Sequence, residues 1–186
     1  MGGVPIIEED PDVRVEWIGW EGRPPGQDFA GYSPRDKQEN YENKHKPLAE
    51  KYNVPIRLAG ADYRTTNAHM VTIYARDKGK FKEFRDRIYK ARWVDDLDLE
   101  SPEILARCGE EVGLDGEEIK QVIAEKGYLA TLHSQRAQGK SLGIYGIPSF
   151  VVQGKIFWGI DVIDDVRAEV ARLKEEKLAE QNSKEG

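Results

Sequence analysis

The 186-residue chain has 39% hydrophobic and 33% charged residues, a formal net charge of −6 and one cysteine. This composition is typical of a folded domain with a sizeable core and not of a disordered chain. An acidic chain attracts phosphates poorly, its apolar runs are too short to cross a bilayer, and a lone thiol forms no internal disulfide. We therefore expect no nucleic-acid partner, no membrane span and no structural disulfide.

The first residues contain no basic segment followed by an apolar stretch, so the sequence predicts no secretory signal and a cytoplasmic location. The three histidines, His45, His69 and His133, are far apart in the sequence. None of them combines with Cys108 in the spacing of a metal site, so we expect no bound metal.

The first predicted element is a strand, because residues 13–17 alternate apolar and polar side chains. A loop rich in proline and glycine follows at residues 22–26. Ser33 and Pro34 are a typical N-cap and first residue of a helix, which Pro47 is expected to kink or split.

The middle of the chain has the periodicity of several helices. Residues 65–91 predict two helices separated by residues 78–80. Ser101 begins another helix, and Asp115 with Glu118 resembles a capping box that begins the next one.

Cys108 falls in an apolar stripe of one of these helices. The other members of the stripe are Ile104, Leu105 and Val112. A cysteine in such a stripe behaves as a small buried hydrophobic side chain. We expect this role for Cys108 rather than that of a nucleophile.

The pattern changes after Gly143, where residues 149–152 and 156–158 form two β-rich runs separated by Gly154. Together they predict a hairpin. A final helix is predicted from apolar residues at helical spacing, namely Val162, Ile163, Val166, Val170 and Leu173. Beyond Lys174 the chain is rich in Lys and Glu and is expected to fray.

The order strand, helices, hairpin, helix predicts an α/β fold with an all-helical insertion. We divide the chain into an N-terminal segment, a sheet portion in two pieces, a helical insertion and a charged tail. Their bounds are 1–12, then 13–32 with 141–175, then 33–140, and last 176–186.

The stretch GIYGIPSFVVQGKIFWGID, residues 143–161, resembles the cis-proline loop and closing hairpin of the DsbA-like thioredoxin superfamily. Its end, Phe157-Trp158-Gly159-Ile160-Asp161, is most similar to the branch of 2-hydroxychromene-2-carboxylate isomerases and kappa-class glutathione transferases. The Pro-Pro-Gly loop at residues 24–26 is similar to FrnE-like members. The resemblance spans roughly residues 13–175 and implies a thioredoxin-like fold of the DsbA type.

The resemblance also implies a substrate site. In this family the backbone before the proline turns outward and pairs with an extended peptide or with the cysteinyl part of glutathione. The implied substrate-binding residues are Ile147 and Pro148, together with Trp158 and Gly159 beside the cleft. The implied partner is a thiol peptide, or glutathione as a cosubstrate, with no other cofactor.

Asp161 has two interpretations. In the glutathione-using relatives a carboxylate at this place holds the γ-glutamyl end of the tripeptide. A carboxylate near the start of the last helix is also explained by capping alone. Ile160, which replaces a polar neighbour in those relatives, favours capping.

The nucleophile of the family is missing from this sequence. Its members begin with a strand and a helix headed by Cys-x-x-Cys, or by Ser in the isomerase and kappa branch. Residues 1–12 contain no Cys or Ser and are too few for that connection. We therefore expect an N-terminally truncated domain with no catalytic residue, inactive as it stands.

The leading interpretation is a DsbA-family protein that resembles thiol-disulfide oxidoreductases. The alternatives are a glutathione-dependent isomerase or transferase and a non-catalytic peptide-binding module. A sheet that lacks its interior strand has an open edge. We expect either residues 4–7 or a second copy of the chain, as a homodimer, to cover it.

Overall fold

The computed structural model of the chain describes residues 7–22 and 31–185, with side chains described up to Ser183. The chain forms two compact units. The helical unit is Ile18–Ser141, and the hairpin unit combines Met1–Trp17 with Leu142–Gly186. The predicted four-part division stays a prediction.

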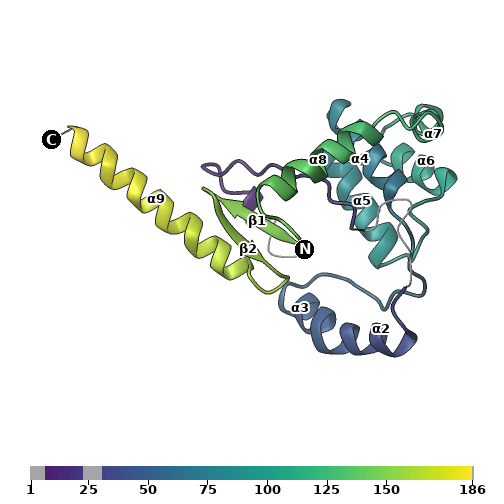
Figure 1. Cartoon of the computed structure of the whole chain (residues 1–186), viewed down its shortest axis with the longest axis horizontal. Helices are drawn as coiled ribbons and strands as arrows, with labels where there is room; N and C mark the ends of the chain where they lie inside the picture. Colours follow the sequence, from purple (N-terminus) through teal and green to yellow (C-terminus); the bar gives the residue numbers. More distant parts are fainter. Residues whose placement is uncertain (1–6, 23–30, 186) are drawn as a thin grey trace. The chain divides into compact units, whose positions relative to one another are not determined.

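The described part of the helical unit is built from helices alone (Figure 1). They are α2 (Pro34–Asn40), the π-helix η1 (Tyr41–His45), α3 (Lys46–Lys51), α4 (Thr66–Asp77), α5 (Phe81–Trp93), α6 (Pro102–Glu110), α7 (Gly116–Ala124) and α8 (Leu129–Ser141). The predicted pair of helices over residues 65–91 is confirmed.

Local capping signals explain where three of these helices begin. The Ser33 hydroxyl accepts the Asp36 N–H at 3.1 Å, and the Ser101 hydroxyl accepts the Ile104 N–H at 3.3 Å. Asp115 accepts the N–H groups of residues 117 and 118 at 2.8 and 3.0 Å. These predicted caps are confirmed, because a cap depends only on residues within one turn.

The reciprocal half of the predicted capping box is not formed. The Glu118 carboxylate accepts the Tyr74 hydroxyl at 2.6 Å and pairs with Lys78 at 2.7 Å. Glu118 therefore binds side chains from α4 and its C-terminal end instead of the Asp115 backbone N–H, which a capping box would require.

Pro47 neither ends nor sharply breaks its helix. The chain passes through the π-helical turn η1, in which the Lys46 N–H donates to the Tyr41 carbonyl, and continues as α3. A proline removes one backbone donor, and a wider turn at a helix interior is one known response to such a defect.

The core of the helical unit lies among α4–α7. Its fully buried side chains include Val71, Phe84, Leu105, Cys108 and Ile119. Cys108 is 0% exposed, so its predicted role as a small hydrophobic core residue is confirmed.

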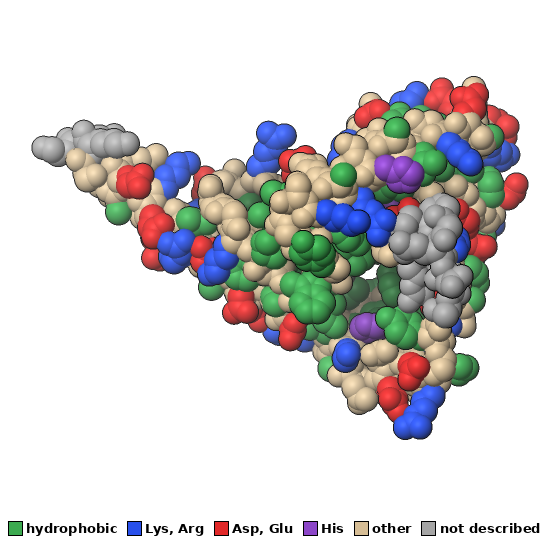
Figure 2. Space-filling model, in the orientation of Figure 1, with side chains coloured by type: hydrophobic (Ala, Val, Ile, Leu, Met, Phe, Trp, Pro, Cys, Tyr) green, Lys and Arg blue, Asp and Glu red, His purple; other side chains and the backbone are tan. Residues whose placement is uncertain are grey.

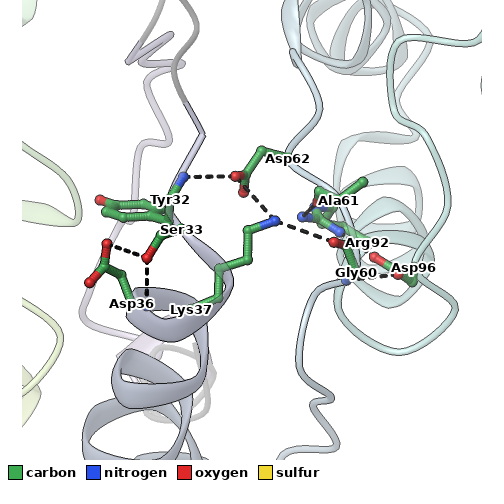
Figure 3. Close-up of polar contacts among 9 residues, drawn as sticks. All are labelled: Tyr32, Ser33, Asp36, Lys37, Gly60, Ala61, Asp62, Arg92 and Asp96. Carbon is green, nitrogen blue, oxygen red and sulfur yellow. Dashed lines mark hydrogen bonds and ion pairs between the residues drawn. The ribbon is translucent and has the colours of Figure 1, made fainter.

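The segment α2–η1–α3 lies outside this core and contains no buried side chain. Polar contacts position its start, as Figure 3 shows: Asp62 accepts the Tyr32 N–H at 3.0 Å and pairs with Lys37 at 3.2 Å. Asp96 holds the same loop by accepting the Gly60 N–H at 2.9 Å. Contacts of two carboxylates thus hold residues 60–62 within the loop before α4.

The hairpin unit contains β1 (Ser149–Val152), β2 (Lys155–Trp158) and α9 (Ile163–Glu185). The strands are antiparallel, with Phe150 opposite Phe157 and Val151 opposite Ile156. Gln153 and Gly154 connect them with φ values of 48° and 84°, as a two-residue type I′ turn requires. The predicted hairpin is confirmed.

The two faces of the hairpin differ. Phe150 and Phe157 are half-buried, whereas Val151 and Ile156 on the other face are exposed. Ile163 and Val166 of α9 are buried, in agreement with the predicted apolar stripe.

Two predictions for the hairpin unit are wrong. Residues 13–17 alternate half-buried and exposed side chains but form no strand, because among the described residues no neighbouring strand pairs with them. The expectation that residues 4–7 cover the open edge of the sheet, which requires an extended segment, fails at Ile7, which is helical and buried, while residues 4–6 lie outside the described part.

The charged end of the chain, where fraying is predicted, is helical in the structure. Helix α9 continues to Glu185, with charged side chains along it (Figure 2). Its Lys, Glu, Ala and Leu residues are good helix formers, and pairs such as Arg172–Glu176 join successive turns. No helix in the described ranges has the length and apolar character needed to span a membrane.

Candidate functional site

The predicted site residues lie together at the open end of the hairpin. The Pro148 carbonyl accepts the Gly159 N–H at 3.1 Å, which extends the register of the two strands by one pair. The Ser149 hydroxyl donates to the Gly146 carbonyl at 2.7 Å and closes the loop before β1. The peptide bond between Ile147 and Pro148 is cis.

Ile147 presents unpaired backbone groups at this end of the hairpin. Its side chain is 58% exposed. Within the described ranges, neither its N–H nor its C=O takes part in a hydrogen bond. A free donor and acceptor on one exposed residue are the groups to which an extended ligand backbone binds.

Trp158 packs over Gly146 from the neighbouring strand. A β-carbon on Gly146 would lie 2.5 Å from the Trp158 indole nitrogen, so only glycine leaves room for this ring. The indole is nevertheless 67% exposed and offers a wide apolar surface. The sequence does not indicate this role of Gly146, because the contact depends on the conformation of the Trp158 side chain.

Asp161 lies next to Gly159. A β-carbon on Gly159 would lie 2.9 Å from an Asp161 carboxylate oxygen, and the φ of +125° at Gly159 also favours glycine. The carboxylate is exposed and has no hydrogen bond or ion pair with the described residues.

The capping interpretation of Asp161 is wrong. The first helical bond of α9 runs from the Val166 N–H to the Val162 carbonyl at 3.0 Å. Val162 therefore occupies the N-cap position, and Asp161 lies one residue too early to cap the helix. Its carboxylate remains available to a ligand.

Apolar surface surrounds these groups. Seven of the twelve exposed large hydrophobic residues in the described part belong to residues 142–160, and hydrophobic side chains gather around the hairpin in Figure 2. The seven are Leu142, Tyr145, Ile147, Val151, Ile156, Trp158 and Ile160. Tyr145, at 85% exposure, was not singled out in the sequence.

The single thiol, Cys108, is not a ready nucleophile. Burial raises the pKa of the Cys108 thiol, which disfavours the reactive thiolate. Burial also lowers the pKa of His69 to about 4, so this imidazole is neutral at physiological pH. No group of three or more His, Cys, Asp or Glu in the described ranges is arranged to hold a metal ion.

Two acidic side chains meet at the start of α4 in the helical unit. Glu21 is 2% exposed and accepts the Thr66 hydroxyl, and Glu100 accepts the Asn67 N–H at 3.3 Å. Burial raises the pKa of Glu100, and the nearby Glu21 adds to this shift. The N-cap residue Thr65 makes no side-chain cap, and Glu100, distant in sequence, accepts a backbone N–H of this helix end in its place.

Relatives of known sequence resemble most of this chain. The protein YwbO of Bacillus subtilis (strain 168) is 26% identical over 152 residues, which is 80% of this chain and 76% of that protein. A 2-hydroxychromene-2-carboxylate isomerase of Sphingobium xenophagum is 28% identical over 116 residues. That match covers 62% of this chain and 59% of the isomerase.

Solved structures share the fold. A probable DsbA oxidoreductase from Streptomyces coelicolor superposes with a TM-score of 0.74 at 18% identity, covering 92% of this chain and 81% of that one. A 2-hydroxychromene-2-carboxylate isomerase gives a TM-score of 0.69 at 16% identity, covering 81% of this chain and 75% of that one. The thioredoxin-like α/β fold implied by the hairpin motif is confirmed.

The family assignment follows from a match that spans most of the sequence. The model of the DSBA-like thioredoxin domain matches residues 6–171, which include the hairpin, its loop and the helical unit. The chain therefore belongs to the DSBA-like thioredoxin domain family.

Proposed function

We propose that this chain binds the backbone of a thiol peptide, or of glutathione, at the open end of its hairpin. In this role it is the substrate-holding part of a protein that resembles thiol-disulfide oxidoreductases. The observation that carries the proposal is the exposed Ile147 backbone, whose N–H and C=O have no partner among the described residues.

The surrounding groups suit such a ligand. An extended peptide that pairs with Ile147 adds one rung beside β1. In this proposal the exposed Trp158 ring covers apolar parts of the ligand, and the exposed Asp161 carboxylate binds a cationic amino group. Glutathione combines an extended backbone, a thiol and an α-amino group of this kind.

This chain is proposed to bind without exchanging disulfides. Its single thiol, Cys108, is fully buried in the helical unit and has a raised pKa. Thiol exchange requires attack by an accessible thiolate. The 186-residue chain should therefore give only background turnover in a disulfide-exchange assay, and turnover like that of an authentic oxidoreductase would contradict this.

The second candidate function is a glutathione-dependent isomerase of the 2-hydroxychromene-2-carboxylate type, or a kappa-type transferase. It is supported by a 2-hydroxychromene-2-carboxylate isomerase among the sequence relatives and by one among the structural neighbours. The free carboxylate of Asp161 favours glutathione over a longer peptide for this candidate. A cytoplasmic location, expected from the sequence, stays a prediction.

Calorimetric titration with reduced glutathione tests the binding proposal. Asp161→Asn should weaken binding about tenfold, because a charge-assisted contact of roughly 1.4 kcal/mol is lost. Asp165→Asn is the matched control, since it removes the same charge from an exposed residue in the first turn of α9. Equal losses in both variants, or no binding by the unmodified chain, would refute the proposal.

A further inference from the structure

The outer edge of β1 presents a short row of unpaired backbone groups. The bond between Gly159 and Pro148 identifies those two residues as a hydrogen-bonded pair. Pairs alternate along an antiparallel ladder, so Phe150 and Val152 also point toward β2. The N–H and C=O groups of Ser149 and Val151 must then point away from β2.

No described strand other than β2 pairs with β1, and no described residue bonds to the backbone of Ser149 or Val151 at this edge. The sheet contains β1 and β2 alone among the described residues, and the described part of the helical unit contains no strand. A two-stranded hairpin of four-residue strands is marginal by itself in water. An added strand along β1 would complete its hydrogen bonding.

The composition of β1 also leaves its edge unprotected. Sheet edges that must stay free usually carry lysine, proline or a bulge. Residues 149–152, Ser-Phe-Val-Val, contain none of these, whereas β2 begins with Lys155. Of the two edges of the hairpin, that of β1 is therefore the one suited to pairing.

We propose that a second copy of this chain pairs with β1 through the same edge, in antiparallel orientation about a two-fold axis. With the axis at Phe150, Ser149 of each copy faces Val151 of the other, and all outward-pointing groups of these residues are satisfied. The two Phe150 rings then lie across from each other as an aromatic cross-strand pair. Residues 149–152 contain no charged side chain, so no like charges meet where the β1 edges of the two copies pair.

The contact is short, so the dimer should be weak, with a dissociation constant on the order of micromolar. Hydrogen exchange followed over a protein concentration series across that range tests the pairing. Amide protection at Ser149 and Val151 should rise with concentration, whereas that of Phe150 and Val152, which face β2, should not change. Protection at Ser149 and Val151 that is equal at all concentrations would show that the edge is covered within one chain.

A pair of proline variants provides the second test. Val151→Pro removes an outward N–H from β1 and should raise the dissociation constant, measured by analytical ultracentrifugation, at least about tenfold. Ile156→Pro is the matched control. Ile156 lies opposite Val151, and its N–H points outward from the β2 edge of the hairpin, which the proposed dimer does not use. It should change dimerisation less than about twofold.

Three outcomes would overturn the proposal. They are a chain that stays monomeric at all concentrations, equal effects of the two proline variants, and a dimer without added protection at Ser149 and Val151. The exchange measurement uses the unmodified chain, so it decides the matter even where a proline variant fails to fold. The exchange measurement contains no glutathione, so its outcome can be told apart from that of the binding proposal, even though a ligand paired with Ile147 uses the same edge of β1.

Discussion

The helical unit and the hairpin unit bury their hydrophobic residues to different extents. In the helical unit a continuous set of side chains among α4–α7 is almost fully buried, with Phe84, Leu105 and Ile119 at 0% exposure. In the hairpin unit the aromatic residues of the strands are half-buried at best, and Trp158 is 67% exposed. The helical unit therefore holds the more completely buried core, and the surface that we propose for binding lies on the more exposed hairpin unit.

The largest expected effect separates these two roles directly. Phe84→Ala should destabilise the helical unit by about 3–5 kcal/mol, because it removes a fully buried ring from a closed core. Phe157→Ala, the same change at a half-buried position of β2, should cost about 1–2 kcal/mol. Urea unfolding followed by circular dichroism measures both, and equal losses would remove the contrast between the units.

Thiol labelling sharpens the contrast, because Cys108 reports on the opening of the helical core. Burial and a raised pKa should make its reaction with a disulfide reagent at least about a hundredfold slower in the native chain than in denaturant. Phe84→Ala should speed the native reaction, whereas Phe157→Ala should leave it nearly unchanged. Fast native labelling would contradict the core position of Cys108.

The pH dependence of stability tests the hairpin unit. Hydrogen bonds from Arg172 and Lys155 lower the pKa of Glu169 to about 2, from an ordinary value of 4.5. A carboxyl group whose pKa is lower in the folded state stabilises the fold above pH 4.5, and this contribution is lost as the pH falls toward 2. Thermal unfolding of the wild-type chain should therefore shift to lower temperature across this window.

Glu169→Gln should flatten that part of the profile. Glu175→Gln, the same change at an exposed position of α9, should leave the slope unchanged. Identical profiles for Glu169→Gln and the wild-type chain would show that the contacts of Glu169 do not stabilise the fold.

The smallest effect is expected for the exposed pair of Arg172 and Glu176 on α9. Glu176→Gln should change stability by no more than about 0.5 kcal/mol, because exposed pairs one turn apart contribute little. Differential scanning calorimetry of the variant beside Glu175→Gln measures this difference. A loss as large as that of Phe157→Ala would show that the end of α9 is more than a solvated helix.

Local features of the chain could be predicted from the sequence, and pairing over long distances could not. The caps at Ser33, Ser101 and Asp115 depend on neighbours within one turn, and the stripe that holds Cys108 depends on helical period alone. The alternation at residues 13–17 correctly indicates one half-buried side. It contains no information on a partner strand, and none of the described residues provides one.

The same difference between local features and features that depend on the three-dimensional structure holds for the candidate site. The motif around Ile147 and Pro148 indicates the hairpin and its loop, and the register then brings Gly159 and Trp158 beside them. The contact between Trp158 and Gly146 depends on a side-chain conformation, which no spacing rule gives. Whether Asp161 can cap α9 depends on a shift of one residue in the start of that helix. Such a shift is smaller than the error with which helix boundaries are predicted from sequence.

Amide chemical-shift mapping with reduced glutathione tests most directly whether the hairpin unit is the binding surface. Saturable shifts should centre on the backbone amides of Ile147 and Gly159 and on the Trp158 indole, and Asp161→Asn should weaken them. The core of the helical unit, including residues around Phe84, should not respond. Saturable shifts confined to the helical unit, or shifts at the hairpin that are unaffected by Asp161→Asn, would contradict the proposed site.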